Sequence, residues 1–332
     1  MTWGLCFWMT TAMAFQAAAD STWIVGGPNP PSVEGGRPVE VGVGFHIVDF
    51  GRITAREESY DVTAHLELRW RDPRLARGAG DGKIWTPRLN FDNAAEAPKL
   101  HGDPRIEVDP DGWVTSRSIL SLKLSTPLDL RKFPFDSQDL VARLSLSSDQ
   151  SKVRFTPLPG SMHVHDDAFV TDWSLQKQTF QVKSRRYHPK GDEYSVLEYL
   201  VRVKRRSTFY VWRVLLPLTL LALFPTLVFW FEPTNLQPQI STCMATLIAM
   251  LAFGYSVDFA VPKVAYLTMI DRHAMIGFLF ATAATISVAV VHRHVANGAV
   301  PTALKIQRPL RALYPIAYLA AAGLSIAAGL AS

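Results

Sequence analysis

Cysteine is nearly absent from this chain, which has two cysteines among 332 residues. Cys6 lies in an apolar N-terminal stretch and Cys243 in a long apolar segment, so the polar half between them carries none. A disulfide framework and a CxxC metal site are therefore excluded from that half. It has to be held together by its hydrophobic core, and it is long enough to bury one.

Motifs of enzymes and of nucleic-acid-binding proteins are missing as well. No HExxH sequence occurs, and residues 77–83 (RGAGDGK) fail the spacing of a phosphate-binding loop because Arg77 stands where the first glycine is required. The net charge is only +5, and the longest basic run, residues 204–206, adjoins an apolar segment instead of forming a basic stripe. We therefore expect no enzymatic activity, no cofactor and no nucleic-acid partner.

The N-terminal segment is apolar at first and then consists of small residues, with three alanines before Asp20. This pattern predicts a secretory signal peptide over residues 1–19, although the segment has no Lys or Arg at its start. A retained membrane anchor is the alternative. Residues 20–38 are rich in Gly and Pro, which predicts a flexible arm.

Residues 39–206 alternate apolar and polar side chains in short runs, of which residues 62–70 (VTAHLELRW) are an example. Such runs separated by Gly, Pro and Asp are typical of an all-β sandwich. The sequence therefore predicts an immunoglobulin-like β-sandwich. The clusters expected to form its turns lie at residues 72–73, 78–82, 109–112, 157–160 and 188–192.

Residues 207–332 contain four apolar segments long enough to cross a bilayer, at about 209–231, 237–258, 275–292 and 312–331. Arg and Lys are frequent between the third and fourth segments, and none lies between the first and second. The positive-inside rule then places the third connection in the cytoplasm, and the sandwich and the C-terminus outside. We expect a multi-pass protein of the cell (inner) membrane.

The second apolar segment is unusually polar for a helix that faces lipid. On a helix, a stripe with steps of three or four residues runs along one face and ends near Asp258. A helix with such a face can line water, or it can be an ordinary span that packs against others through small residues. The stripe consists of Gln237, Ser241, Ala245, Ile248, Ala252 and Tyr255.

The most specific motif is residues 131–138 (RKFPFDSQ). Alone it would be a proline turn between two phenylalanine rings. It resembles the signature loop of pentameric ligand-gated ion channels. In animal members a disulfide closes this loop, but Thr126 and Leu140 stand at the matching positions, as in the prokaryotic branch. Further matches in register are Trp70-Arg71-Asp72, Trp85-Thr86-Pro87 with Asn93, Leu215-Leu216-Pro217, Thr246-Leu247-Ile248-Ala249 and Val261-Pro262.

The resemblance implies a homopentamer in which the second helix of each subunit lines a central pore. Gln237 and Ser241 would form the constriction, and the apolar part of the stripe would be the gate. Asp258 would place a ring of carboxylates at the outer mouth, which favours permeant monovalent cations. An anion-selective channel, with Asp258 turned away from the axis, is the alternative. A membrane-tethered receptor without a pore would not need the polar stripe.

The resemblance also implies an agonist site between subunits, below the loop at residues 183–194. Tyr187 and Tyr194 would contribute from one subunit, and His65 and Arg69 from its neighbour. Asp92 and Ser147 stand where aromatic residues are common in the family. The agonist is expected to be a small amine or carboxylate, or protons, and two ordinary strand tyrosines are the alternative.

Two further groups complete the expectations. The resemblance implies that motion passes from the sandwich to the pore through the signature loop, the residue before the first span, and the connection after the second. Separately, the run at residues 163–167 is a weak candidate for a divalent-ion or proton site, and a surface loop is the preferred interpretation. The coupling residues are Phe133, Pro134, Phe135, Asp136, Arg205, Pro262 and Lys263, and the weak candidates are His163, His165 and Asp166.

Overall fold

A computed structural model describes residues 29–31, 36–78, 84–165, 168, 172–189, 191–258 and 264–331, with only the backbone described at 257, 258 and 331. The expected signal peptide and most of the expected arm lie outside these residues. The chain divides into two compact units. The first comprises Met1–Leu128 and Asp139–Val203, and the second comprises Asp129–Gln138 and Lys204–Ser332.

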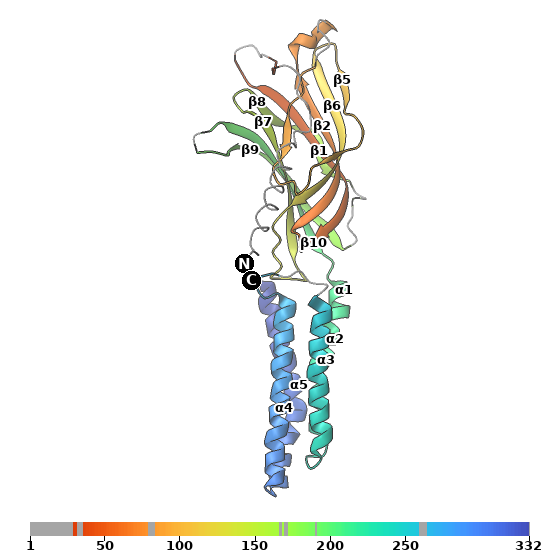
Figure 1. The fold of residues 1–332 in the computed structure, drawn as a ribbon, viewed down its shortest axis with the longest axis vertical. Helices are drawn as coiled ribbons and strands as arrows, with labels where there is room; N and C mark the ends of the chain where they lie inside the picture. Colours follow the sequence, from red (N-terminus) through yellow and green to blue (C-terminus); the bar gives the residue numbers. More distant parts are fainter. Residues whose placement is uncertain are drawn as a thin grey trace, which may run out of the picture. The chain divides into compact units, whose positions relative to one another are not determined.

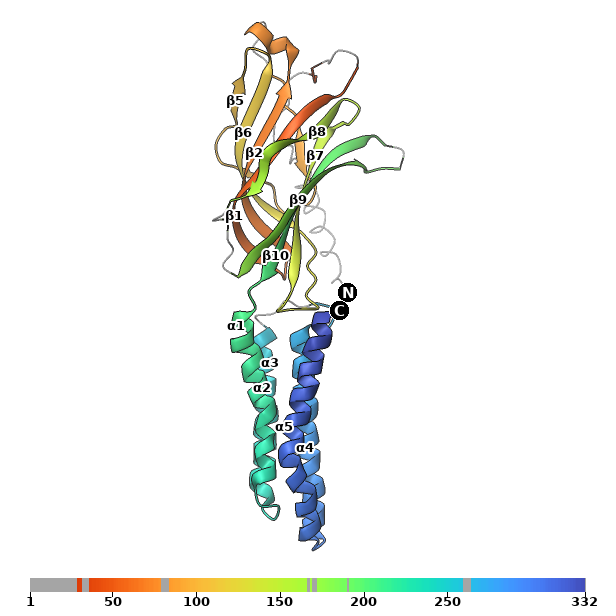
Figure 2. The ribbon, with the colours of Figure 1, turned by 180° about the vertical axis from the view of Figure 1, so that it is seen from behind.

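Two β-sheets make up the first unit (Figures 1 and 2). One sheet has the strand order β4-β6-β2-β1-β8 with β5 paired to β6, and the other has the order β3-β7-β10-β9. β1 is antiparallel to β2 and parallel to β8. The strands are β1 Val39–Thr54, β2 Ser59–Arg71, β3 Leu89–Phe91, β4 Lys99–Leu100, β5 Arg105–Val108, β6 Trp113–Ser125, β7 Ser137–Asp149, β8 Val153–Val164, β9 Trp173–Arg186 and β10 Glu193–Arg205, and η1 Pro73–Gly78 is a short 3₁₀ helix.

The alternating pattern of the sequence is the reason for this arrangement. Along β2, buried side chains follow every second position, since successive residues of a strand point to opposite faces. Trp70 is fully buried and meets the Trp85 ring edge-on at 5.9 Å, while Phe45 packs against Tyr199 at 6.0 Å. These contacts fill a single core, and the predicted β-sandwich is confirmed.

The expected turn at residues 157–160 is wrong, because β8 continues through it. β8 is the edge strand of its sheet, where a proline without an N–H is tolerated. The pairing register with β1 shifts between Val43 and Phe45, and Gly160 adopts a φ of 77°. A bulge therefore absorbs the turn-forming residues without ending the strand.

Four helical segments in the described part of the second unit are long and apolar enough to cross a membrane, at Thr208–Trp230, Leu236–Ser256, Met269–Ala296 and Val300–Leu330. The predicted order, a sandwich followed by four apolar helices, is confirmed. The elements are α1 Thr208–Tyr210, the π-helix η2 Val211–Leu215, α2 Leu216–Leu223, the 3₁₀ helix η3 Phe224–Trp230, α3 Leu236–Asp258, α4 Met269–Ala296 and α5 Val300–Ala331.

The first span changes helix type along its length because Pro217 and Pro225 lack the N–H that a regular α-helix needs. Carbonyl groups of η3 are bonded instead by α5, where Arg311 Nε donates to Phe229 O at 2.9 Å and Gln307 Nε2 donates to Val228 O at 3.3 Å. α4 and α5 run side by side (Figures 1 and 2) and begin before the expected spans, since polar turns extend both helices.

Candidate functional site

A hollow of about 440 Å³ lies on the four-stranded sheet at the β9–β10 connection. It brings together four of the six residues expected at the agonist site: Asp92, Ser147, Tyr187 and Tyr194. Among the described residues, its lining includes two carboxylates and no Lys or Arg. The other lining residues are Asn90, Ser145, Leu146, His188, Gly191 and Asp192.

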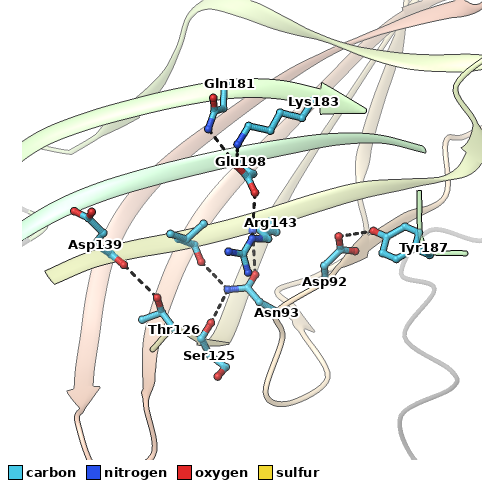
Figure 3. Close-up of polar contacts among 11 residues, drawn as sticks. Asp92, Asn93, Ser125, Thr126, Asp139, Arg143, Gln181, Lys183, Tyr187 and Glu198 are labelled. Atoms are coloured by element: carbon cyan, nitrogen blue, oxygen red, sulfur yellow. Dashed lines mark hydrogen bonds and ion pairs between the residues drawn. The ribbon is translucent and has the colours of Figure 1, made fainter. Parts of the chain in front are cut away.

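Asp92 is the polar centre of this hollow. The Tyr187 hydroxyl donates to Asp92 Oδ2 at 2.5 Å, as Figure 3 shows, and the Ser145 hydroxyl donates to Oδ1 at 2.5 Å. Burial raises the pKa of Tyr187, and its hydrogen bond to the Asp92 carboxylate raises it further. Tyr187 therefore stays a protonated donor, and Asp92 is held in place from two sides.

Aromatic faces border this carboxylate. The Tyr187 and Tyr194 rings lie 5.5 Å apart between centroids, inclined at 56°. The guanidinium carbon of Arg185 lies 5.6 Å from the Tyr187 ring centroid, within the range of a cation–π contact. The Tyr187 ring therefore already accepts a cation on one face.

A series of polar contacts, which begins next to Asp92 at Asn93, connects the strands that carry the hollow (Figure 3). Asn93 Nδ2 donates to Val141 O at 2.6 Å, and Asn93 Oδ1 accepts the Arg143 N–H at 3.0 Å. Arg143 also reaches Glu198 at 3.3 Å, and Lys183 reaches the same carboxylate at 2.6 Å. The hydrogen bond from Lys183 is the main reason that the pKa of Glu198 lies below its usual value. These contacts tie β7, β9 and β10 together.

The two residues expected from a neighbouring subunit lie on the other sheet of this chain. His65 lines a separate hollow with three further histidines. Arg69 shares the exposed face of β2 with His65, and its guanidinium carbon lies 4.9 Å from the Trp113 ring centroid. Within one chain, His65 and Arg69 therefore do not line the same hollow as Tyr187 and Tyr194. The contact of Trp113 with Arg69 was not predicted from the sequence.

The signature loop belongs to the helical unit. Arg205 Nε donates to Asp136 Oδ1 at 2.7 Å and Nη2 donates to Oδ2 at 3.0 Å, with both side chains buried. Gln138 Nε2 donates to the same carboxylate at 2.6 Å and to Asp129 O at 2.7 Å, so it closes the loop on itself. Thr126, at one of the two cysteine positions of the family, bonds Asp139 O at 3.1 Å through its hydroxyl.

Two tyrosines that sequence reasoning missed hold this loop against helical elements of its own unit. The Phe133 ring meets the Tyr210 ring edge-on at 4.7 Å, and Arg205 lies over Phe133 at 4.8 Å. The Tyr266 hydroxyl accepts the Leu130 N–H at 2.8 Å. Tyr210 follows Ser207 at the start of the first span, and Tyr266 precedes the residue that caps α4. Their positions at helix ends were the sequence feature from which a contact with the loop could have been predicted. The Phe133–Pro134 peptide bond is cis, and Phe135 is half-buried.

In the single chain, the predicted stripe of α3 is exposed. Ile248 is 62% and Tyr255 71% exposed, and Gln237, Ser241, Ala245 and Ala252 are exposed as well. Two polar residues of α3 outside the stripe are turned away: Gln239 is buried and bonds Glu232 O, and the buried Thr246 bonds Thr242 O. The helix thus buries Gln239 and Thr246 and exposes Gln237 and Ser241 on the stripe.

Four of the expected residues cannot be placed. The Asp258 side chain, Asp166, Pro262 and Lys263 lie outside the described residues. His163 is the second last residue of β8 and His165 follows that strand, on the same face. Among the residues that the structure describes, no three His, Cys, Asp or Glu side chains already converge as a metal site.

Comparison with known proteins agrees with this geometry. The family described as the neurotransmitter-gated ion-channel ligand binding domain matches residues 28–207. A proton-gated ion channel of Gloeobacter violaceus is 28% identical over 308 residues, covering 89% of this chain and 84% of that protein. The human glycine receptor subunit beta is 26% identical over 275 residues, covering 77% of this chain. A gamma-aminobutyric acid receptor subunit beta-like protein of Drosophila melanogaster is 24% identical over 285 residues, covering 78%.

This chain spans 55% of the length of the glycine receptor subunit and 57% of the Drosophila protein. The match to the ligand-binding domain covers more than half of the chain, and four apolar helices follow it. The chain therefore belongs to the neurotransmitter-gated, or pentameric ligand-gated, ion-channel family.

Proposed function

We propose that five copies of this chain assemble into an agonist-gated, cation-selective channel of the cell membrane. The observation that carries the proposal is the exposed stripe of α3, on which polar and small residues give way to Ile248 and Tyr255. Five such stripes around an axis would form a water-filled path with an apolar constriction, which can gate by dewetting. Buried partners such as Met250 would stay inside each four-helix bundle.

We further propose that the agonist is a small ammonium compound. Asp92 and Asp192 border the hollow, and no Lys or Arg is among the described residues that line it, so the charge of this described lining favours a cation over a carboxylate. The Tyr194 ring beside Tyr187 offers an aromatic face for an ammonium group, whereas Arg185 already lies over the Tyr187 ring. His65 and Arg69 of a neighbouring subunit would face the site across the interface, where Arg69 would add one positive charge opposite the two carboxylates.

Cation selectivity rests on the sequence of α3. No Lys or Arg lies along residues 235–258, and Asp258 ends the helix. A carboxylate ring at the pore mouth would concentrate cations there. The signature loop would transmit agonist binding to the helices through Asp136, Arg205 and Tyr266, with the sandwich and the C-terminus outside the cell.

The test is to record currents from the purified protein in planar bilayers. Small amines, small carboxylates and pH steps are applied in turn, and a salt gradient gives the reversal potential. We expect amine-evoked currents that reverse near the cation potential, and a smaller conductance for Asp258→Asn. Protons are the second candidate signal because the bacterial relative is named a proton-gated channel. Silence under every condition would favour a tethered receptor, and reversal at the chloride potential would contradict cation selectivity.

A further inference from the structure

Three histidines lie side by side on neighbouring strands of the six-stranded sheet. His46 of β1 is paired with His65 of β2 on one side and with His163 of β8 on the other. Strands in a sheet lie about 4.8 Å apart, so the three Cα atoms form a short row across it. The imidazoles share the sheet face that points away from the core, with ring centroids 6.1 Å apart for His46–His65 and 3.8 Å for His46–His163.

A fourth histidine extends the row into a cluster. His165 lies two residues after His163, and its N–H bonds Ile47 O at 2.8 Å, which prolongs the strand pairing past the end of β8. Its ring centroid lies 5.9 Å from that of His46. Three of the four rings therefore surround His46.

The cluster lines an open hollow of about 510 Å³. Small residues leave room above the rings: Gly44, Gly160 and Ser161 share the lining with Glu67. A Cβ at Gly44 would lie 2.6 Å from Ser161 Cβ, so glycine allows β1 and β8 to approach closely at this point. The backbone thus places four histidines beside a space large enough for a hydrated ion, and their rings have to reorient to converge on it.

The chemistry of the cluster suits a metal. Burial lowers the pKa of His46, and the neighbouring His163, His65 and His165 lower it further. Neutral imidazole has a free nitrogen lone pair, the form that binds metal ions. Glu67 adds a carboxylate, which forms an ion pair with Arg117 at 3.5 Å.

We propose that His46, His163, His165 and His65 form a site for a borderline transition-metal dication such as Zn²⁺. Imidazole is a preferred ligand of Zn²⁺, with nitrogen–metal distances of about 2.0–2.1 Å. Tetrahedral ligation at that distance puts two ring centroids roughly 5 Å apart, so each of the three rings, at 3.8, 5.9 and 6.1 Å from His46, would have to shift by roughly 1 Å. Rotation about both the Cα–Cβ and the Cβ–Cγ bonds would bring the rings to this spacing, while the sheet holds the backbone.

The test is calorimetric titration of the purified full-length protein in detergent with Zn²⁺, and with Mg²⁺ as the probe for unspecific binding. We expect one saturable Zn²⁺ per chain, no comparable Mg²⁺ binding, and release by a chelator. Binding should weaken at least tenfold between about pH 7.5 and about pH 5.5, because protons compete for the imidazoles.

The variants are His46→Ala with His163→Ala, the single change His163→Gln, and the control His101→Ala. His101 bonds Ser121 on the same sheet, outside the cluster lining. The double variant should lose at least tenfold in Zn²⁺ affinity, His163→Gln should lose part of it, and the control should keep it. Unchanged affinity in both cluster variants, equal binding of Mg²⁺, or no saturable Zn²⁺ binding would overturn the proposal. These readouts do not depend on channel activity.

Discussion

Arg205 donates two parallel hydrogen bonds to the Asp136 carboxylate, of 2.7 and 3.0 Å, and the two side chains are only 7% and 1% exposed. Earlier on the same strand, Arg202 makes the same two-bond contact with Asp139, at 2.6 and 2.7 Å, but there the side chains are 52% and 39% exposed. β10 thus contributes to two arginine–aspartate ion pairs of the same geometry, one buried and one exposed.

This pair of contacts provides a matched stability experiment. Arg205→Met should destabilise the protein by about 3–5 kcal/mol, because the Asp136 carboxylate would stay buried without its guanidinium partner. Arg202→Met should lower the melting temperature far less, since water can solvate Asp139. Thermal unfolding of both variants in detergent is the measurement. Equal shifts in melting temperature would contradict the importance of burial at Asp136.

Tyr266 provides a test of the proposed coupling. Tyr266→Phe removes the acceptor of the Leu130 N–H but keeps the ring that Arg131 approaches at 5.5 Å. An unpaired buried N–H costs about 1–3 kcal/mol, so the loop should hold less firmly to the segment before α4. We expect assembled channels that need more agonist for half-maximal current. Arg131→Ala, which leaves the hydrogen bond intact, should change the response less, and a normal response in Tyr266→Phe would remove Tyr266 from the coupling path.

The agonist hollow is tested by two changes at one hydrogen bond. Asp92→Asn removes the charge that would pair with an ammonium group, and we expect about a tenfold or greater loss of apparent affinity, or about 1.4 kcal/mol. Tyr187→Phe keeps the charge and the aromatic face but removes the hydroxyl donor, so its effect should be smaller. Asp61→Asn, at an exposed carboxylate of the other sheet, is the control. Higher sensitivity of Asp92→Asn to a carboxylate agonist would contradict an amine ligand.

Sequence patterns predicted the architecture because they reflect burial directly. The alternation of apolar and polar residues predicted β2, and the length of the apolar segments predicted the four helices. The same signals misjudged residues 157–160, because a bulge on an edge strand can hold the Pro and Gly that usually make a turn. Hydropathy also missed the polar turns at the start of α4, where Thr268 and Asp271 form a capping box.

Site residues were predictable where a motif named them. The Asp136–Arg205 pair was expected from the signature loop, whereas Tyr266 was missed because an isolated tyrosine in a connection carries no periodic signal. The histidine cluster shows the same limit. His163 and His165 were visible as neighbours in the sequence, but His46 and His65 join them only through strand pairing.

The central claim is that the exposed stripe of α3 lines an ion pathway, and cysteine accessibility tests it most directly. The native Cys243 is 1% exposed and packs inside the bundle, so the wild-type channel is its own control. Agonist-evoked currents are recorded before and after a charged, membrane-impermeant thiol reagent. The stripe variants are Ser241→Cys, Ala245→Cys and Ile248→Cys, and the control on the buried face is Thr246→Cys.

We expect the reagent to block most of the current in the three stripe variants and to leave the wild type and Thr246→Cys unaffected. The reagent should act faster in the presence of agonist, since opening would admit it. Current that survives the reagent in all three stripe variants, or equal block in Thr246→Cys, would contradict a pore lined by this face of α3.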